Sequence, residues 1–298
     1  MMRKKHLLLT TAVLGTVVGI TDAIWATLLS FGVNPSNFVS SYIVMLTFAI
    51  IFVLFIVLAS RKSVERPTNY QMMTGILYGI GNIIFLSVIN AKGLIEIYSF
   101  LYISALVFVI IQIIYNKKRL RASTAAKFFM AALVAIAGLT GLFLSSNTIN
   151  FGFIGGYGIL LGVAMVFLYG VAPFFFSLEG TKTKNLGSSI FWVLVSELFV
   201  GLVLFPFGHY GAINLPIISV AGLLLGFFGS LQLLGYMFSK YGGRKSAIYS
   251  TIETILMNSD IILLTLIYII VIGRVSLYQI LSIAALFLGV FYVSNLEI

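Results

Sequence analysis

Long apolar stretches alternate with short polar segments along the whole chain. Each stretch has about the 20 residues that an α-helix needs to cross the hydrocarbon layer of a bilayer. The polar segments between the stretches are too short to form a separate soluble domain. The pattern predicts ten transmembrane helices, at approximately 7–29, 37–60, 70–90, 94–115, 125–145, 155–177, 186–207, 215–238, 246–271 and 276–295. The expected fold class is therefore an all-α polytopic membrane protein.

The first apolar stretch follows a basic start, MMRKKHLLLTTAVLG, as the hydrophobic part of a signal peptide does. Signal peptides have a shorter apolar region, of about 7–15 residues, and a cleavage site with small residues. This stretch is longer and has no clear site of that kind. We interpret it as an uncleaved first span, with a cleaved signal peptide as the alternative.

Composition agrees with the hydropathy pattern. Of the 298 residues, 60% are hydrophobic and 9% are charged, whereas about 25% are charged in an ordinary soluble domain. The net charge of +10 does not indicate a nucleic-acid partner, because the basic residues lie in short segments between apolar stretches. The chain has no Cys, which excludes disulfides, Cys-ligated metals and a thiol nucleophile.

The basic residues also predict the orientation in the membrane. If the N-terminus lies inside, all of the 18 Lys and Arg residues except Lys92 and Arg274 fall on the inner side. Cytoplasmic loops of membrane proteins carry an excess of Lys and Arg. We therefore expect a multi-pass protein of the cell (plasma) membrane with both termini in the cytoplasm.

Short sequence matches relate the two halves of the chain. Ile97-Tyr98-Ser99 recurs as Ile248-Tyr249-Ser250, and Gly138 recurs as Gly289, both at an offset of 151. Earlier in each half the offset is 147, where Gly75-xxx-Gly79 matches Gly222-xxx-Gly226. Chance matches between common residues are the alternative explanation. The order of the matches and the repeated layout of spans favour an internal repeat.

An internal repeat with five spans in each half has a structural consequence. Five is an odd number, so residues 151–298 would enter the membrane from the side opposite to residues 1–150. The sequence thus predicts two inverted five-helix repeats. This plan recurs in secondary transporters, whose substrate site lies near the membrane midplane between the repeats.

The chain resembles the EamA-type branch of the drug/metabolite transporter superfamily. The resemblance is strongest at the ends of the halves, from Ile97-Tyr98-Ser99 through Gly138-Leu139 and from Ala247-Ile248-Tyr249-Ser250 through Leu288-Gly289-Val290. Asn34-Pro35, after the first span, is also similar to the family pattern. The resemblance implies ten spans as two inverted repeats, cytoplasmic termini and a transport function, and it favours export.

Four carboxylates lie well inside the predicted spans: Asp22, Glu197, Glu253 and Asp260. A carboxylate near the bilayer centre costs about 2.5–3.5 kcal/mol on insertion scales and usually faces a cavity or a partner. No Lys or Arg lies clearly within a span, so each group would be protonated, face water or bind a cation. We expect these residues to border a central cavity and to bind substrate or a proton. Hydrogen-bonded contacts between helices are the alternative for each one.

Other residues of the spans are weaker candidates for the lining of this cavity. They are Trp25, Tyr78, Asn82, Tyr98, Gln232 and Tyr249. Aromatic residues in such chains more often pack between helices or anchor them at the interface. Amides can equally hydrogen-bond between helices.

The function expected from these features is secondary transport by alternating access. Carboxylates without basic neighbours favour neutral, zwitterionic or cationic metabolites or drugs over phosphorylated ones, and proton-coupled export is the expected mode. A channel or a lipid flippase is the alternative, and a membrane-embedded enzyme is a more remote one. The sequence predicts no cofactor, no metal, no nucleic-acid partner, and a monomer or homodimer in the lipid bilayer.

Overall fold

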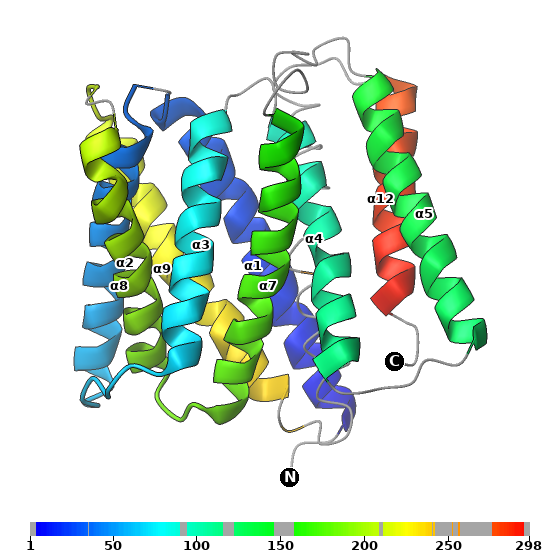
Figure 1. Cartoon of the computed structure of the whole chain (residues 1–298). Helices are drawn as coiled ribbons and strands as arrows, with labels where there is room; N and C mark the ends of the chain where they lie inside the picture. Colours follow the sequence, from blue (N-terminus) through cyan, green and yellow to red (C-terminus); the bar gives the residue numbers. More distant parts are fainter. Residues whose placement is uncertain are drawn as a thin grey trace.

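The computed structural model is a bundle of α-helices (Figure 1). It describes residues 4–89 except 35, then 94–115, 122–145, 158–208, 211–239, 241, 252, 256 and 276–294. The helices of this part of the chain are α1 (Lys4–Gly32), α2 (Phe38–Ala59), α3 (Asn69–Val88), α4 (Leu94–Tyr115), α5 (Ala122–Ser145), α7 (Gly158–Lys182), α8 (Leu186–Leu204), α9 (Leu215–Ser239) and α12 (Leu277–Ser294). A short 3₁₀ helix, η1 (Phe205–Phe207), follows α8.

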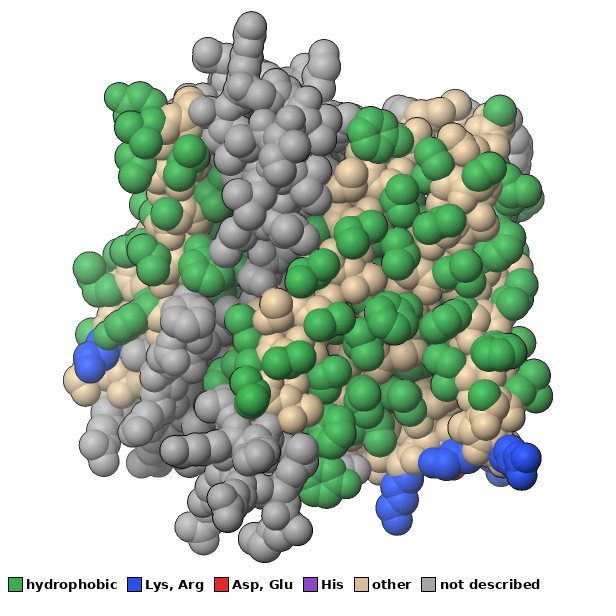
Figure 2. All heavy atoms as spheres, turned by 180° about the vertical axis from the view of Figure 1, so that it is seen from behind, with side chains coloured by type: hydrophobic (Ala, Val, Ile, Leu, Met, Phe, Trp, Pro, Cys, Tyr) green, Lys and Arg blue, Asp and Glu red, His purple; other side chains and the backbone are tan. Residues whose placement is uncertain are grey.

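Seven of the described helices are long and apolar enough to cross a membrane: α1, α2, α3, α5, α7, α8 and α9. Their outer surfaces carry large apolar side chains; Phe55 and Leu58 of α2, for example, are 72% and 75% exposed. Figure 2 shows such side chains spread over the flank of the bundle, with Lys and Arg near its lower end. A sheath of apolar side chains with charges at one end is the construction of a polytopic membrane protein.

The predicted spans agree closely with most of these helices. The prediction of 94–115 coincides with α4, and those for α2, α3, α9 and α12 are within two residues at each end. The sixth prediction, 155–177, is too short at its end, because α7 passes through Pro173 and continues to Lys182. Hydropathy marks where charges begin, whereas backbone hydrogen bonds decide where a helix ends. The predicted ninth span, 246–271, lies outside the described residues apart from 252 and 256.

Side-chain caps begin two of the central helices at the same end of the bundle. Thr68 and Gln71 form a capping box at the start of α3: the Gln71 amide donates to Thr68 Oγ1 at 3.2 Å, and the Thr68 amide donates to Gln71 Oε1 at 2.9 Å. Asn185 caps α8, because its Oδ1 accepts from the Ser188 amide at 3.2 Å. Caps of this kind satisfy amides that have no partner in the first turn of a helix.

Three sets of helices pack against one another, and each set combines helices from before and after residue 150. Helix α3 lies against α7 and α8, helix α9 lies against α1 and α2, and α5 pairs with α12. Figure 1 shows α1 beginning at the lower end of the bundle and α7 at the upper end. Helix α1 and helix α7, which is the first described helix after residue 150, therefore run in opposite directions.

Glycines allow several of these helix pairs to approach closely. Gly75 and Gly79 of α3 lie against α8, and Gly222 and Gly226 of α9 lie against α2. A methyl group added at Gly226 would lie 3.0 Å from the Ala49 carbonyl oxygen, which is tighter than nine in ten real contacts of this kind. In lipid the hydrophobic effect does not drive helices together. Small residues allow the close van der Waals packing that does.

Helices α5 and α12 each place a glycine against the backbone of the other helix. A methyl group at Gly138 of α5 would lie 2.5 Å from the Leu286 amide nitrogen of α12. A methyl group at Gly289 of α12 would lie 2.6 Å from the Ala131 carbonyl oxygen of α5. Each helix thus presents one glycine to the backbone of the other.

Gly222→Ala tests this close packing. Its methyl group would overlap the Met45 carbonyl oxygen and would lie 2.8 Å from Phe48 Cβ. We expect a loss of about 1–3 kcal/mol in the free energy of unfolding, which is typical of overpacking. Thermal unfolding of the purified protein in detergent measures it.

Gly229→Ala is the matched control on the same helix, since a methyl group there meets nothing within 4 Å. Replacing a helical glycine by alanine without a clash leaves stability unchanged or raises it. Equal melting temperatures for the two variants would contradict the packing argument.

Candidate functional site

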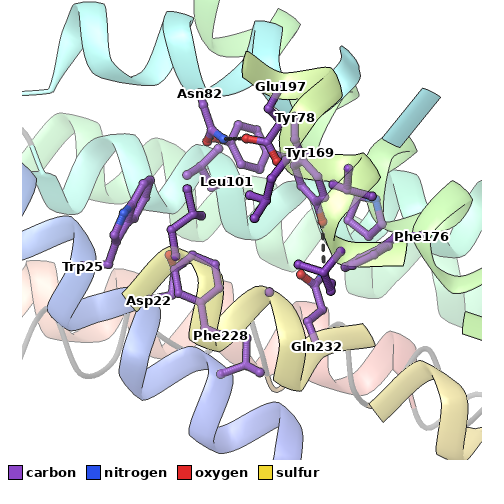
Figure 3. Close-up of a pocket in the computed structure, with 17 residues that line it drawn as sticks. Asp22, Trp25, Tyr78, Asn82, Leu101, Tyr169, Phe176, Glu197, Phe228 and Gln232 are labelled. Carbon is purple, nitrogen blue, oxygen red and sulfur yellow. Dashed lines mark hydrogen bonds between the residues drawn. The ribbon is translucent and has the colours of Figure 1, made fainter. Parts of the chain in front are cut away.

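An internal cavity lies among six helices, α1, α3, α4, α7, α8 and α9 (Figure 3). It gives the centres of water-sized molecules about 80 Å³ of space. The described residues of the lining are Val18, Asp22, Trp25, Tyr78, Asn82, Leu101, Tyr169, Pro173, Phe176, Ile190, Val193, Leu194, Glu197, Leu225, Phe228, Gly229 and Gln232. A compact apolar hollow with a few convergent polar groups is the usual form of a small-molecule site.

Glu197 is the most deeply buried charged residue of this lining. It lies in the middle of α8 and is 3% exposed. Its Oε2 accepts hydrogen bonds from Tyr42 OH at 2.9 Å and from Asn82 Nδ2 at 3.1 Å. These donors come from α2 and α3 and replace part of the hydration that the carboxylate loses.

Tyr169 extends this hydrogen-bonded chain to a fourth helix. Its hydroxyl donates to Asn82 Oδ1, so α7, α3, α8 and α2 are joined through side chains. Asp22 and Glu197 both line the cavity beside Tyr169. The two carboxylates therefore belong to one site, although they lie on helices far apart in the sequence.

Asp22 enters the cavity from α1 and is half-buried. In Figure 3 it lies across the cavity from Glu197. Trp25, about one turn further along α1, is held in place by its neighbours. Its ring stacks on Phe85 at 5.7 Å between centroids and meets the edge of Phe228 at 5.8 Å. Its position next to Asp22 is thus fixed before any ligand arrives.

Aromatic rings and an amide complete the wall beside Glu197. Tyr78 meets Tyr169 and Phe176 edge to face, with centroids 5.9 Å and 6.3 Å apart. The Tyr78 hydroxyl accepts a hydrogen bond from Gln232 Nε2 at 3.0 Å. Within the described part of the chain, no Lys, Arg or His lines the cavity. The lining is acidic and aromatic.

The structure brings six of the ten predicted site residues together around this cavity. They are Asp22, Trp25, Tyr78, Asn82, Glu197 and Gln232. Glu253, Asp260 and Tyr249 lie outside the described residues, as does the side chain of Tyr98 on α4.

The sequence prediction missed Tyr42, Tyr169, Phe176 and Phe228. Aromatic residues occur throughout these spans, and in a helix that is apolar on all sides no periodicity shows which ring points inward. Tyr169 and Phe176 are seven residues apart and share one face of α7, which is the signal that was available.

A second buried carboxylate, Glu179, was not predicted as a functional residue. It lies near the end of α7 and is 2% exposed. Its oxygens accept three hydrogen bonds: from Thr68 Oγ1 at 2.8 Å, and from Gln71 Nε2 and Ser189 Oγ at 2.7 Å each. It therefore joins the end of α7 to the first turns of α3 and α8. The prediction passed over it because it placed residues 178–185 in a loop.

Further hydrogen bonds surround Glu179 at the lower end of the bundle. Asn185 Nδ2 donates to the Ser63 carbonyl at 2.9 Å, and Lys182 Nζ donates to Tyr70 OH at 2.9 Å. Trp192 Nε1 donates to the Glu65 carbonyl at 2.6 Å. These contacts tie the segment between α2 and α3, and the first turn of α3, to the end of α7 and the beginning of α8.

Glu179→Ala is expected to destabilise the protein. The change leaves the buried donors of Gln71, Ser189 and Thr68 without their acceptor, and one buried unsatisfied group costs about 1–3 kcal/mol. The melting temperature in detergent should fall clearly below that of the wild type. Glu65→Ala removes an exposed carboxylate of the same region and should change it little. A melting temperature for Glu179→Ala equal to that of Glu65→Ala would contradict the assigned role.

Comparison with known proteins bears on the fold alone. No family model matches the chain, and no curated protein sequence matches it. A solved structure described only as "Crystal structure of protein" superposes with a TM-score of 0.63, covering 93% of this chain and 95% of the other. The two sequences are 19% identical. The similarity extends over nearly the full length of both chains and shows that this helical fold exists in a solved structure.

Proposed function

We propose that the protein is a secondary transporter that moves small neutral, zwitterionic or cationic metabolites or drugs by alternating access, as a proton-coupled exporter. The observation that carries this proposal is the internal cavity with Asp22 and Glu197 on opposite sides. Ionisable residues inside a membrane domain mark substrate or proton pathways by default. The proposed family is the EamA-type branch of the drug/metabolite transporters.

Two inverted five-helix repeats, 1–150 and 151–298, are part of the proposal. An offset of 147 relates α3 to α9 and α2 to α8. The contact of Gly75 and Gly79 with α8 then corresponds to the contact of Gly222 and Gly226 with α2. The opposite directions of α1 and α7 in Figure 1 agree with an inversion. Helix α5 of the first half would correspond to α12 of the second. Their contact would therefore join the two equivalent helices.

The cavity would lie where these two halves meet. Asp22, Trp25 and Asn82 come from the first half, and Tyr169 and Glu197 come from the second. A site shared between two rigid units can be exposed to either side when the units rock against each other. The proposed mechanism therefore needs no large change inside either half.

The network around Glu179 would act as the closed gate of this conformation. Its partners Thr68 and Gln71 belong to the first half, and Glu179 and Ser189 belong to the second. Arg61, Lys62, Lys182 and Lys184 lie in the segments at the same end of the bundle. By the distribution of basic residues this end would face the cytoplasm, so that both termini of a plasma-membrane protein are cytoplasmic.

Asp22→Asn and Glu197→Gln are expected to abolish coupled transport while the protein still folds. Purified protein in liposomes with an imposed pH gradient would be tested with a panel of amino acids and organic amines. Flux should fall to that of protein-free liposomes in both variants, because neither can bind and release a proton at that position. Glu65→Gln is the control with the same chemical change outside the cavity. Wild-type flux in both cavity variants would contradict the proposed mechanism.

Cross-linking tests whether the end near Glu179 must open. The natural chain has no Cys, so Gln71→Cys with Ser189→Cys introduces one defined pair, at positions whose side chains are 3.1 Å apart. A short bifunctional thiol reagent should stop flux, and a reducible version should allow recovery after reduction. Each single Cys variant is the control for modification alone. Undiminished flux in the cross-linked protein would contradict alternating access through this gate.

A further inference from the structure

The charges of the cavity distinguish between the substrate classes that a transporter of this kind can carry. Asp22 and Glu197 line it from different helices, and none of the lining residues that the structure describes is basic. A ligand with a negative group would face two carboxylates in a medium of low dielectric constant, where like charges repel strongly. A ligand with only a positive group would meet opposite charge on both sides.

The hydrogen-bond donors of the lining also disfavour an anionic ligand. Asn82 Nδ2 donates to Glu197, the Tyr169 hydroxyl donates to Asn82, and Gln232 Nε2 donates to Tyr78. A carboxylate or phosphate ligand is normally held by several donors or by Arg and Lys. Here these donors are already engaged within the protein, and the existing network would have to break to hold an anion.

The aromatic rings supply the remaining part of a cation site. Trp25, Tyr78, Tyr169 and Phe228 all line the cavity. Ring faces attract cations, Trp most strongly, and groups of such rings are the usual receptors for substituted ammonium groups. The stacking of Trp25 on Phe85 fixes one of these rings in advance, which reduces the entropy lost on binding. The limited space of the cavity, about 80 Å³ for the centres of water-sized molecules, suits a compact ligand.

We infer that this cavity binds a small organic cation with a substituted ammonium group, and that it rejects neutral and zwitterionic molecules of the same shape. The inference rests on the proposed function, because it names the substrate class of that same site. Of the neutral, zwitterionic and cationic substrates in the proposed function, it keeps only the cationic ones. The cation lies between the two carboxylates, with its methyl or methylene groups against the aromatic rings.

Binding in detergent, without any flux, tests the inference. Trp192→Phe leaves Trp25 as the one remaining tryptophan, since the chain has two, and its fluorescence then reports on the cavity. The probes are choline, its neutral isostere 3,3-dimethyl-1-butanol, and the zwitterion betaine, which carries the same trimethylammonium group. We expect choline to bind about tenfold or more tightly than either of the others.

Variants locate the selectivity in the cavity. In the Trp192→Phe background, Asp22→Asn or Glu197→Gln should reduce the preference for choline over its neutral isostere, and Glu65→Gln should leave it unchanged. Equal affinity for choline and 3,3-dimethyl-1-butanol overturns the inference, and so does betaine binding as tightly as choline. Absence of binding by all three probes also overturns it, since choline meets the stated size and charge.

The flux experiment separates this inference from the proposed function. If coupled flux of amino acids requires Asp22 and Glu197 while choline shows no preference, transport stands and the cation assignment fails. If choline binds selectively while no solute in the panel moves across the liposome membrane, the cation site stands and transport fails. The two results are measured in different preparations and do not depend on each other.

Discussion

The structure depends on the cost of burying carboxylates inside an apolar helical bundle. Glu197 and Glu179 are 3% and 2% exposed, and each accepts hydrogen bonds from neutral side chains of other helices. A buried polar group without a partner costs far more than a paired one gains. Helices α2, α3, α7 and α8 must therefore keep the positions in which Tyr42, Asn82, Thr68 and Gln71 reach these oxygens. The polar contacts therefore help to specify how these four helices are arranged.

The close approach of helix backbones is the second constraint. It explains why glycines lie at so many of the contacts between helices. Between helices in lipid the hydrophobic effect contributes little, so van der Waals contact and side-chain hydrogen bonds decide association. Gly75 brings α3 against α8 at Val193 and Ser196, one turn from Glu197. The short distance between these helices is what allows Asn82 of α3 to reach Glu197. The glycine contact and the polar contact thus reinforce each other on the same pair of helices.

The sequence predicted the helices well and the site in part, for a physical reason. Apolar length marks where a chain crosses a bilayer, so the bounds of α2, α4 and α9 were accessible, and the charge of Asp22 and Glu197 made them conspicuous in apolar spans. Hydropathy could not show that α7 extends past 177 and buries Glu179, because that burial depends on partners in α3 and α8. Nor could it separate Tyr169 from the many other aromatic residues. An aromatic residue can be assigned to the cavity wall only when it is known which face of its helix points inward.

The two buried glutamates show how the same side chain can serve a structural or a functional role. Glu179 uses both oxygens, with three donors from α3 and α8, and does not line the cavity. Glu197 receives its two cross-helix hydrogen bonds on Oε2 and lies in the cavity wall with Asp22 opposite. A carboxylate enclosed by donors contributes to stability and opens only if the helices around it separate. One that borders a cavity can exchange a proton or a cation while the helices stay together. Their difference in environment, rather than in burial, is the physical basis for the proposal that Glu179 takes part in closure and Glu197 in ligand exchange.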